Sequence, residues 1–314
     1  MTKTPVVMIS FNRPDLVRLT MRNVSLAEGA NDREITMFID GPRNDSDKAK
    51  QNEIFDIVES YQDILPRLKI VRRDRNLGCR GNIVDAITTE LNRSGRAIVI
   101  EDDILVSRTF LRYMDEALEF YENDKRIWCI NAYQNPYFKV PKGYRFDLYL
   151  NPVNMCWGWG TWKDRWQGVD FDLKTWEVDK QDAALIARLN KAGRQIIPMI
   201  DAQYAGRLKT WDVQCTYHVV KNGLRCVEPI HQLSKNVGFG FGGEHFSGDL
   251  PFLSRQKYFN FMPRMVKTIP EVEEISRQWE YTLCHRNLFE RIKRKFIRGC
   301  AWLRRANNEP LDVE

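Results

Sequence analysis

The first 120 residues alternate short apolar runs with longer amphipathic stretches. The apolar runs are rich in β-branched residues and cover 6–10, 34–39, 68–71 and 97–100. Their length and composition predict buried strands. The stretches between them have apolar residues at helical spacing and predict helices over 15–26, 46–64, 82–91 and 107–121. This alternation predicts an α/β fold with a mostly parallel sheet flanked by helices.

Polar residues follow each predicted strand at the point where it ends. In chain order they are Asn12 and Arg13, then Asp40, then Asn76 and Arg80, then Glu101, Asp102 and Asp103. In open α/β sheets, ligands bind outside the carboxyl ends of the strands. These residues are therefore predicted to meet at one ligand site.

The acids Glu101, Asp102 and Asp103 are the most informative group. Three consecutive carboxylates beside a buried strand repel one another and lose hydration, which is unfavourable unless a cation or several donors compensate. Carboxylate oxygens are ligands that Mg²⁺ and Mn²⁺ prefer. We hypothesise a metal site that grips a phosphorylated ligand. Alternatively, the acids form an ordinary polar loop, with Asp103 helping to start the next helix.

Two common phosphate-binding loops are excluded. The chain has no GxxxxGK[ST] motif, and no GxGxxG follows the first predicted strand. The glycine-rich segment 238–243 lies far downstream and is interpreted as a loop. A nucleotide held through a metal at the acids is the remaining option.

Composition describes an ordinary globular protein, with 314 residues, 43% hydrophobic and 29% charged. The seven cysteines include no CxxC pair, which argues against a disulfide scaffold and a structural zinc site and favours a reducing compartment. Residues 1–5 show no signal-peptide pattern, and no apolar run approaches the roughly 20 residues that span a bilayer. We expect a cytoplasmic protein.

The positive charge is concentrated near the C-terminus. Residues 285–305 contain eight Lys or Arg and one Glu, whereas the rest of the chain is nearly balanced. With no basic excess on the body, no nucleic-acid partner is expected. Apolar residues of this segment share one helical face: Phe289, Ile292, Phe296, Cys300 and Leu303. The resulting basic amphipathic helix either docks on the anionic inner face of the cytoplasmic membrane or packs on the body with its basic side solvated.

Seven segments, in order, carry a family resemblance over about residues 5–246. They are Ser10 to Pro14, Asp40-Gly41, Asn76 to Gly78, Glu101 to Asp103, Trp157 to Trp162, Trp211 to Gln214 and Asn236 to Gly240. With them the chain resembles the GT-A fold glycosyltransferases, and looks most like bacterial polysaccharide transferases related to the N-acetylglucosaminyltransferase I group. The resemblance implies a Rossmann-like catalytic domain over 1–255 and a helical basic tail over 256–314. Within that domain, residues 1–125 would bind the nucleotide sugar and 126–255 the acceptor.

The resemblance also implies an activity. A metal-dependent, inverting enzyme would move a sugar from a nucleoside-diphosphate donor, with UDP-sugars such as UDP-GlcNAc favoured, to a hydroxyl of a surface-polysaccharide intermediate. That acceptor, of O-antigen or capsule type, would be a glycan or a lipid-linked glycan. Asp103 would bind Mn²⁺ or Mg²⁺, with His245 near the metal or the diphosphate. The other residues of the implied donor site are Glu101 and Asp102 at the ribose or sugar, Asn12, Arg13 and Asp40 at the base and ribose, Asn76, and Arg80 at the phosphate.

Asp212 matches the catalytic base of such enzymes. It lies ahead of a predicted helix, whose dipole would favour the carboxylate form. As a base it would take the proton of the acceptor hydroxyl, and a single in-line displacement would invert the anomeric centre. Alternatively, Asp212 only caps the helix.

Tryptophans are unevenly distributed, with six of the nine between Trp128 and Trp176. Trp162 and Trp166 are predicted to fill the core. Trp157 and Trp159 flank Gly158 in a predicted loop, and the resemblance places them at the donor sugar and acceptor, where indole rings stack on sugars.

Two other functions stay open. A sugar-1-phosphate nucleotidyltransferase would carry a glycine- and lysine-rich loop after the first strand, which Asn12-Arg13-Pro14 does not provide. A catalytically inactive nucleotide-sugar-binding scaffold of a polysaccharide assembly complex would be expected to lack the acids or Asp212, and both are present.

Overall fold

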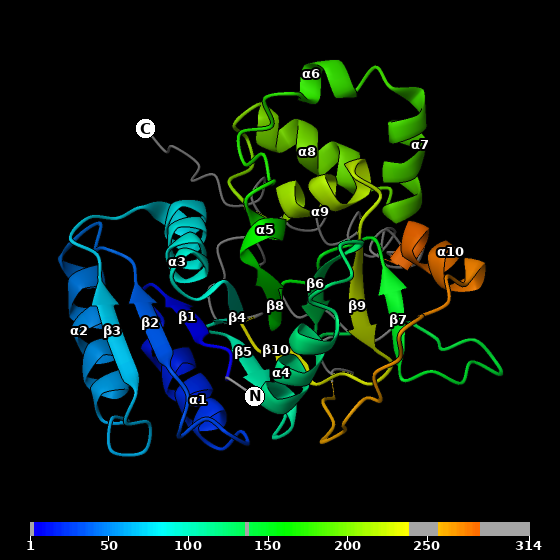
Figure 1. The fold of residues 1–314 in the computed structure, drawn as a ribbon. Helices are drawn as coiled ribbons and strands as arrows, with labels where there is room; N and C mark the ends of the chain where they lie inside the picture. The colour runs from blue at the N-terminus through cyan, green and yellow to red at the C-terminus, as the bar shows by residue number, and fades with distance from the viewer. Residues whose placement is uncertain (1–2, 136–137, 239–256, 283–314) are drawn as a thin grey trace, which may run out of the picture.

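The computed structural model describes residues 3–135, 138–238 and 257–282. Its main sheet contains eight strands: β1 Val6–Ser10, β2 Ile35–Ile39, β3 Leu68–Arg72, β4 Arg96–Glu101, β6 Ile127–Asn131, β7 Leu148–Asn151, β8 Trp159–Trp162 and β9 Arg225–Pro229. Two short strands, β5 Ile104–Val106 and β10 Ser234–Asn236, form a second sheet. The order in the main sheet is β3-β2-β1-β4-β8-β6-β9-β7 (Figure 1).

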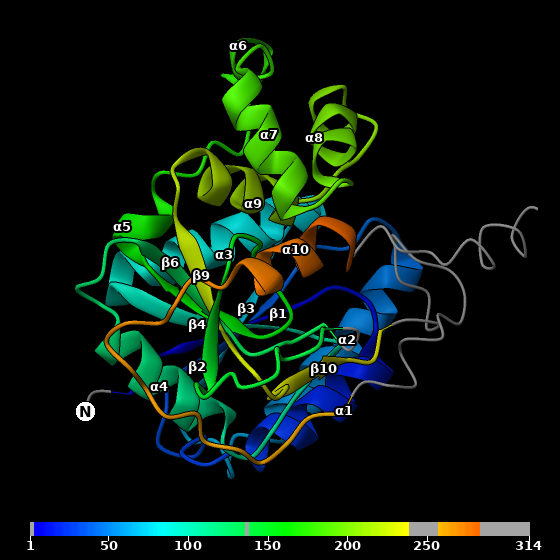
Figure 2. The ribbon, with the colours of Figure 1, turned by 90° about the vertical axis from the view of Figure 1, so that its right-hand side faces the viewer.

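Helices cover the sheet on both faces. Four lie in the first half of the chain: α1 Pro14–Ser25, α2 Asp45–Glu59, α3 Gly78–Ser94 and α4 Phe110–Phe120. The others are α5 Lys163–Trp166, α6 Trp176–Asp179, α7 Ala183–Ala192, α8 Ile196–Tyr204, α9 Asp212–Lys221 and α10 Glu273–Thr282. Figure 2 shows α1 and α4 on one side of the sheet and α3, α5 and α9 on the other. The predicted α/β class is confirmed.

The four strands expected from the apolar runs are confirmed. They are mutually parallel in the order β3-β2-β1-β4, and Met8 of β1 aligns with Met37 of β2 and Ile100 of β4. All five residues of β1 are buried, because successive side chains meet helices on opposite faces. Val6 and Met8 belong to the core under α1, α2 and α4, and Val7 and Ile9 to the core under α3 and α9.

Element boundaries differ from the expectations where local bonding decides them. Helix α2 ends at Glu59 instead of residue 64, because 60–65 form tight turns such as the one closed by the Leu65 N–H to the Tyr61 carbonyl (2.8 Å). Helix α3 starts at Gly78, several residues early, and α4 starts at Phe110 instead of Ser107. Strand β5 was not expected at all, because its partner β10 lies about 130 residues away in the sequence.

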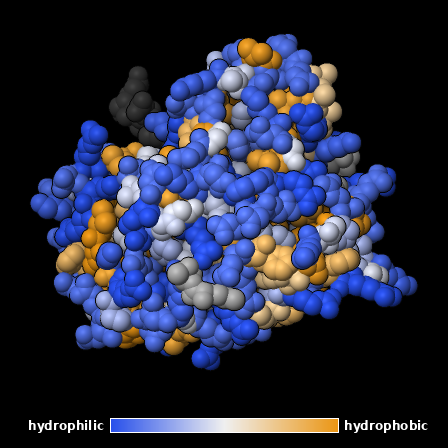
Figure 3. Space-filling view, viewed as in Figure 1, coloured by the Kyte–Doolittle hydropathy of each residue, from blue (hydrophilic) through white to orange (hydrophobic). Residues whose placement is uncertain are grey.

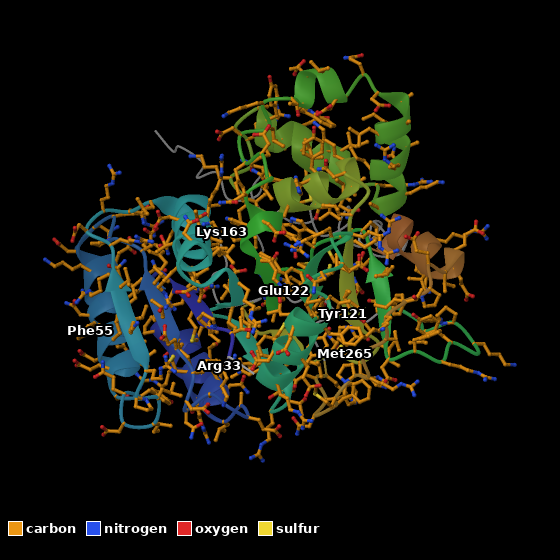
Figure 4. The ribbon with its side chains drawn as sticks, in the orientation of Figure 1. Arg33, Phe55, Tyr121, Glu122, Lys163 and Met265 are labelled. Carbon is orange, nitrogen blue, oxygen red and sulfur yellow. The ribbon has the colours of Figure 1, made fainter. Side chains whose placement is uncertain are left out.

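Residues 257–282, assigned by sequence to the tail, pack on the body. The Tyr121 hydroxyl donates to the Val266 carbonyl (2.9 Å), and Met265 packs on the same core; both side chains are labelled in Figure 4. Ile275 of α10 is buried against the core under α7. The predicted amphipathic segment 285–305 lies outside the described residues.

The surface offers no single apolar belt on the face viewed in Figure 3, where hydrophobic side chains form separate patches among hydrophilic ones. Within the described ranges, no helix has both the length and the apolar character required to cross a membrane.

A buried carboxyl group lies in the second half of the sheet. Glu228 of β9 has no exposed surface and accepts hydrogen bonds from the Tyr149 hydroxyl and the amides of Asn131 and Asn151. Burial raises the pKa of Glu228 to about 8, although those donors oppose the shift. The group is therefore mainly protonated at neutral pH.

We predict a pH-dependent loss of stability from Glu228. The pKa of Glu228 in the folded protein, about 8, lies above its ordinary value of 4.5. Its contribution to the free energy of unfolding is therefore complete below pH 4.5. That contribution is lost as the pH rises through about 8, at up to about 1.4 kcal/mol per pH unit. Glu228→Gln should flatten the decline in Tm between about pH 5 and pH 9, measured by differential scanning calorimetry. The exposed Glu119→Gln serves as control, and parallel curves for all three proteins would contradict the prediction.

Candidate active site

Strand β4 delivers the acids to the carboxyl edge of the parallel strands. Glu101 is its last residue and retains some solvent contact, whereas the Asp102 side chain is only 3% exposed and that of Asp103 13%. The Thr20 hydroxyl of α1 donates to the Asp102 carbonyl (2.8 Å). The turn that carries the acids is therefore fixed to a neighbouring helix.

Arg13 lies directly against two of these acids. Its guanidinium pairs with the Asp102 carboxylate through one nitrogen and with Asp103 Oδ2 through another (3.1 Å). Arg13 precedes Pro14, the first residue of α1, so its backbone is held by the helix start. The expected contact of this side chain with base or ribose stays a prediction; in the structure its guanidinium lies against the acids.

The acids carry more negative charge than Arg13 offsets. Burial, and then repulsion by Asp103 and Asp102, raise the pKa of Glu101 well above its ordinary value. Burial raises the pKa of Asp102 to about 6 even though Arg13 pairs with it. For Arg13, burial disfavours the charged guanidinium, but Asp102 and Asp103 outweigh it and raise its pKa. Three carboxylates and one guanidinium leave a site that favours a further cation.

The backbone around Asp103 is tied to a distant segment. Strands β5 and β10 pair antiparallel, and the Val237 N–H then donates to the Asp103 carbonyl (2.9 Å). Gly238 follows, packed so closely that a Cβ on it would lie 2.8 Å from Asp103 Cβ and Cγ. Only glycine fits there without moving Asp103.

Asp40, expected at the base and ribose, is hydrogen-bonded within the chain. Its buried carboxylate accepts hydrogen bonds from the backbone N–H groups of Gly41, Leu77 and Gly78 and from the Asn76 amide, at 2.8 to 3.0 Å. These four donors use the acceptor positions that a carboxylate offers. Asp40 therefore positions the loop before α3, and its contact with base and ribose stays a prediction. Asn76, which also donates to the Gly41 carbonyl (2.8 Å), belongs to the same support.

Asn12 and Arg80 lie at the same edge with other partners. The Asn12 amide donates to Asp47 of α2 (2.6 Å), which fixes the loop after β1. Arg80, at the start of α3, pairs with the exposed Asp172 (2.6 Å). Exposed pairs of this kind are weak and exchange readily, so the expected phosphate contact by Arg80 stays a prediction.

Asp212 is the first residue of α9, and Trp211 holds the N-cap position. The Asp212 carboxylate accepts a hydrogen bond from the Thr210 hydroxyl instead of capping the helix. Thr210 is itself fixed, because its N–H donates to Gln203 of α8 (2.8 Å) and its carbonyl accepts from Gln214 (3.1 Å). The side chain is thus oriented by a supported hydroxyl.

The charge of Asp212 acts on the acids of β4. Beyond burial and its sequence neighbours, the Asp212 charge contributes to the raised pKa of Glu101. Burial raises the pKa of the Cys156 thiol, and the next causes are Asp212 and then Glu101. Coulomb interactions weaken with distance, so a charge that contributes to both pKa values lies in the neighbourhood of both groups. The residues predicted as metal site and as base, more than a hundred positions apart in the sequence, therefore face one region of the fold.

Trp159, predicted to contact sugar, is part of the core. Its ring has no exposed surface and stacks between Trp128 and Trp211, each at 5.6 Å between ring centroids. The expected loop is strand β8 from Trp159 on, so its ring points into the sheet packing and cannot reach a sugar. Trp157 is only partly buried, with its ring edge-on to Tyr133 at 4.5 Å, and stays a candidate. Trp162 and Trp166 are buried as predicted.

The acids have the ligand chemistry that a divalent cation prefers. The oxygens of the acids suit Mn²⁺ or Mg²⁺, and a cation there would stabilise the charged forms that burial and mutual repulsion disfavour. However, the described residues include no group of three or more His, Cys, Asp or Glu arranged to hold a metal. Asp103 could supply one ligand, and the others would have to come from a bound substrate or from elsewhere in the chain. His245, the second predicted ligand, lies outside the described residues.

No protein-family model matches the chain. Its structure is similar to a mannosyltransferase from Pyrobaculum calidifontis in complex with GDP-Man and Mn²⁺, at 12% identity over 70% of this chain and 69% of the other, with a TM-score of 0.43. Residues 1–349 of S. aureus TarS match at 11% identity over 74% and 59%, with a TM-score of 0.41. Galactosyltransferase LgtC, in complex with donor and acceptor sugar analogues, matches at 8% over 71% and 73%, with a TM-score of 0.39. The fold assignment above rests on the strand order of this chain itself.

Sequence reasoning missed two features of the site. It overlooked Thr210, although a hydroxyl two residues before a candidate base is a recognisable local hydrogen-bonding pattern. It also missed Cys156, because the influence of Asp212 and Glu101 on the pKa of its thiol has no local signal in the sequence.

We predict that Gly238→Ala destabilises the protein by about 1–3 kcal/mol, since the added methyl group must displace Asp103 or the 236–238 backbone. Urea unfolding measures the change. In the control Gly81→Ala, the new Cβ would meet the Leu77 Cβ at 3.2 Å, and alanine is the better helix former in α3. The loss of stability there should therefore be smaller than in Gly238→Ala. Equal unfolding free energies for wild type and Gly238→Ala would show that the close packing is absent.

Proposed function

We propose that this chain is a metal-dependent, inverting glycosyltransferase. The donor is a nucleoside-diphosphate sugar, with UDP-sugars such as UDP-GlcNAc as first candidates, and the acceptor is a hydroxyl of a surface-polysaccharide intermediate. The observation that carries the proposal is the meeting of the acids of β4 with Asp212 of α9 at the carboxyl edge of the parallel strands. Ligands of open α/β folds bind at this edge.

Each side chain has a chemical task in this proposal. Asp212, the first residue of α9, is oriented by Thr210 and accepts the proton of the acceptor hydroxyl as its oxygen attacks the anomeric carbon. Asp103 would hold Mn²⁺ or Mg²⁺ together with the donor's diphosphate. When bound, such a cation supplies Lewis-acid stabilisation of the charge on the departing diphosphate. Arg80 contributes a second positive charge near phosphate, and Trp157 a ring face for sugar.

Location is part of the proposal. A lipid-linked glycan acceptor would bring the protein to the inner face of the cytoplasmic membrane, where the basic segment 285–305 could meet anionic lipid.

The deciding experiment tests a panel of nucleotide sugars with the wild-type protein and with variants of Asp212 and Asp103. Purified protein is incubated with UDP- and GDP-sugars, with and without Mn²⁺, and nucleotide release and product anomer are measured. We expect Mn²⁺-dependent release and an inverted product, with Asp212→Asn lowering kcat by about 10²–10⁴-fold because general-base catalysis is lost. Asp103→Asn should abolish the Mn²⁺ dependence.

The control for both variants is Asp63→Asn, an exposed aspartate outside the site. Near-normal transfer by Asp212→Asn, or a retained anomer, rules out the base. Unchanged turnover by Asp103→Asn rules out the metal ligand. Tight binding of one donor without any turnover identifies a scaffold, and pyrophosphate formation from a sugar-1-phosphate and a nucleoside triphosphate identifies a nucleotidyltransferase.

A second prediction concerns the hydroxyl that orients the base. Thr210→Val removes the donor to Asp212 but keeps the side-chain shape, so kcat should fall about 3- to 30-fold, the range of one lost hydrogen bond, while the donor KM stays unchanged. Thr210→Ser should restore kcat. A matching fall in Thr210→Ser, or a rise in donor KM with unchanged kcat, would argue against an orienting role.

A further inference from the structure

Arg13 occupies the place where the proposed function requires a cation. Its guanidinium bridges Asp102 and Asp103 from one side, and its own side chain is 26% exposed. A guanidinium and a divalent cation are both drawn to the same carboxylate oxygens, and two positive charges cannot share them closely. A divalent cation that binds these carboxylates must therefore compete with Arg13 for them.

The two arms of the bridge are unequal. Asp102, only 3% exposed, is the inner partner, and its carbonyl is fixed by Thr20. Asp103, 13% exposed, is the outer partner, at 3.1 Å. Breaking a buried pair is costlier than breaking an exposed one. The ion pair between Arg13 and Asp103 is therefore expected to break before the one with Asp102.

The loop beneath the guanidinium is held firmly. Asn12 donates to Asp47, and Arg43 pairs with the same Asp47 (2.8 Å) while its guanidinium lies over the Phe11 ring (4.6 Å). Pro14 starts α1 immediately after Arg13. The backbone therefore stays in place, and an exchange of partners is confined to the Arg13 side chain.

We propose that Arg13 is an exchangeable counter-cation of the acid site. Without ligand it neutralises Asp102 and Asp103, and it releases Asp103 when a divalent cation binds. The freed guanidinium donors then suit the oxygens of a nucleoside diphosphate, which match their fork geometry. This inference rests on the proposed function for the identity of the ligand. It adds that Arg13 opposes the metal and supports the nucleotide.

The test is a pair of binding measurements with opposite expected signs. Mn²⁺ binding to the ligand-free protein is followed through the EPR signal of free Mn²⁺ at fixed ionic strength, and UDP binding at saturating Mn²⁺ by calorimetry. In Arg13→Gln, Mn²⁺ should bind at least 10-fold more tightly than in wild type, whereas UDP should bind at least 10-fold more weakly. General damage to the site would weaken both.

The matched control is Arg93→Gln. Arg93 also bridges two carboxylates, Glu34 and Glu90, but lies at the end of α3, near the amino ends of β2 and β4. It should leave both affinities unchanged. Equal or weaker Mn²⁺ binding by Arg13→Gln, or unchanged UDP binding, overturns the proposal.

A second variant covers a failure of Arg13→Gln to fold. Arg13→Lys keeps one charge without the fork, so its Mn²⁺ affinity should lie above that of wild type; an affinity equal to wild type overturns the proposal. Recovery of native circular dichroism by Mn²⁺ in an otherwise unfolded Arg13→Gln supports it. Neither binding measurement involves sugar transfer. Tighter Mn²⁺ binding and weaker UDP binding can therefore be found even if no donor is turned over. A failure of this proposal is thus distinguishable from a failure of the proposed function.

Discussion

Excess negative charge at the carboxyl end of β4 is the constraint on which the site depends. Glu101, Asp102 and Asp103 cannot be hydrated freely, because the sheet and α1 surround them, and Asp212 adds a further charge from the other half of the fold. Arg13 offsets part of this charge. The remainder sets the chemistry, since a site with this imbalance gains from a bound cation and from whatever ligand brings one.

A stack of buried tryptophans supports the start of α9, where the proposed base lies. Trp128 of β6, Trp159 of β8 and Trp211 before α9 form one stack across the sheet and the helix layer. Aromatic pairs of this size bury large areas and contribute beyond that burial. Trp211 immediately precedes Asp212, so the stack fixes the start of α9. Trp159, expected at the sugar, instead packs against the ring that precedes the proposed base.

The sequence predicts those features that depend on local pattern. Apolar runs bounded by polar residues located β1 to β4 and the acids at their ends, because a strand buried on both faces leaves a continuous signature. The pairing of β5 with β10, the engagement of Arg13 with Asp102 and the full burial of Trp159 were missed, because each depends on residues far apart in the chain. Asp40 shows the same limit: its position at a strand end was correct, but its four donors come from a loop beyond the next strand as well as from its own neighbour.

Asp40 has one further consequence. The first backbone N–H groups of α3 point at its carboxylate, so the positive end of that helix already holds an anion supplied by the chain. Dinucleotide-binding folds, by contrast, leave the N-terminus of the helix after their first strand open for phosphate. At α3 the chain itself supplies the anion, so a phosphate beside this helix end must be met by side-chain cations. Affinity for an anionic ligand at this helix end therefore depends on cationic side chains, which can change partners, and not on fixed backbone N–H groups.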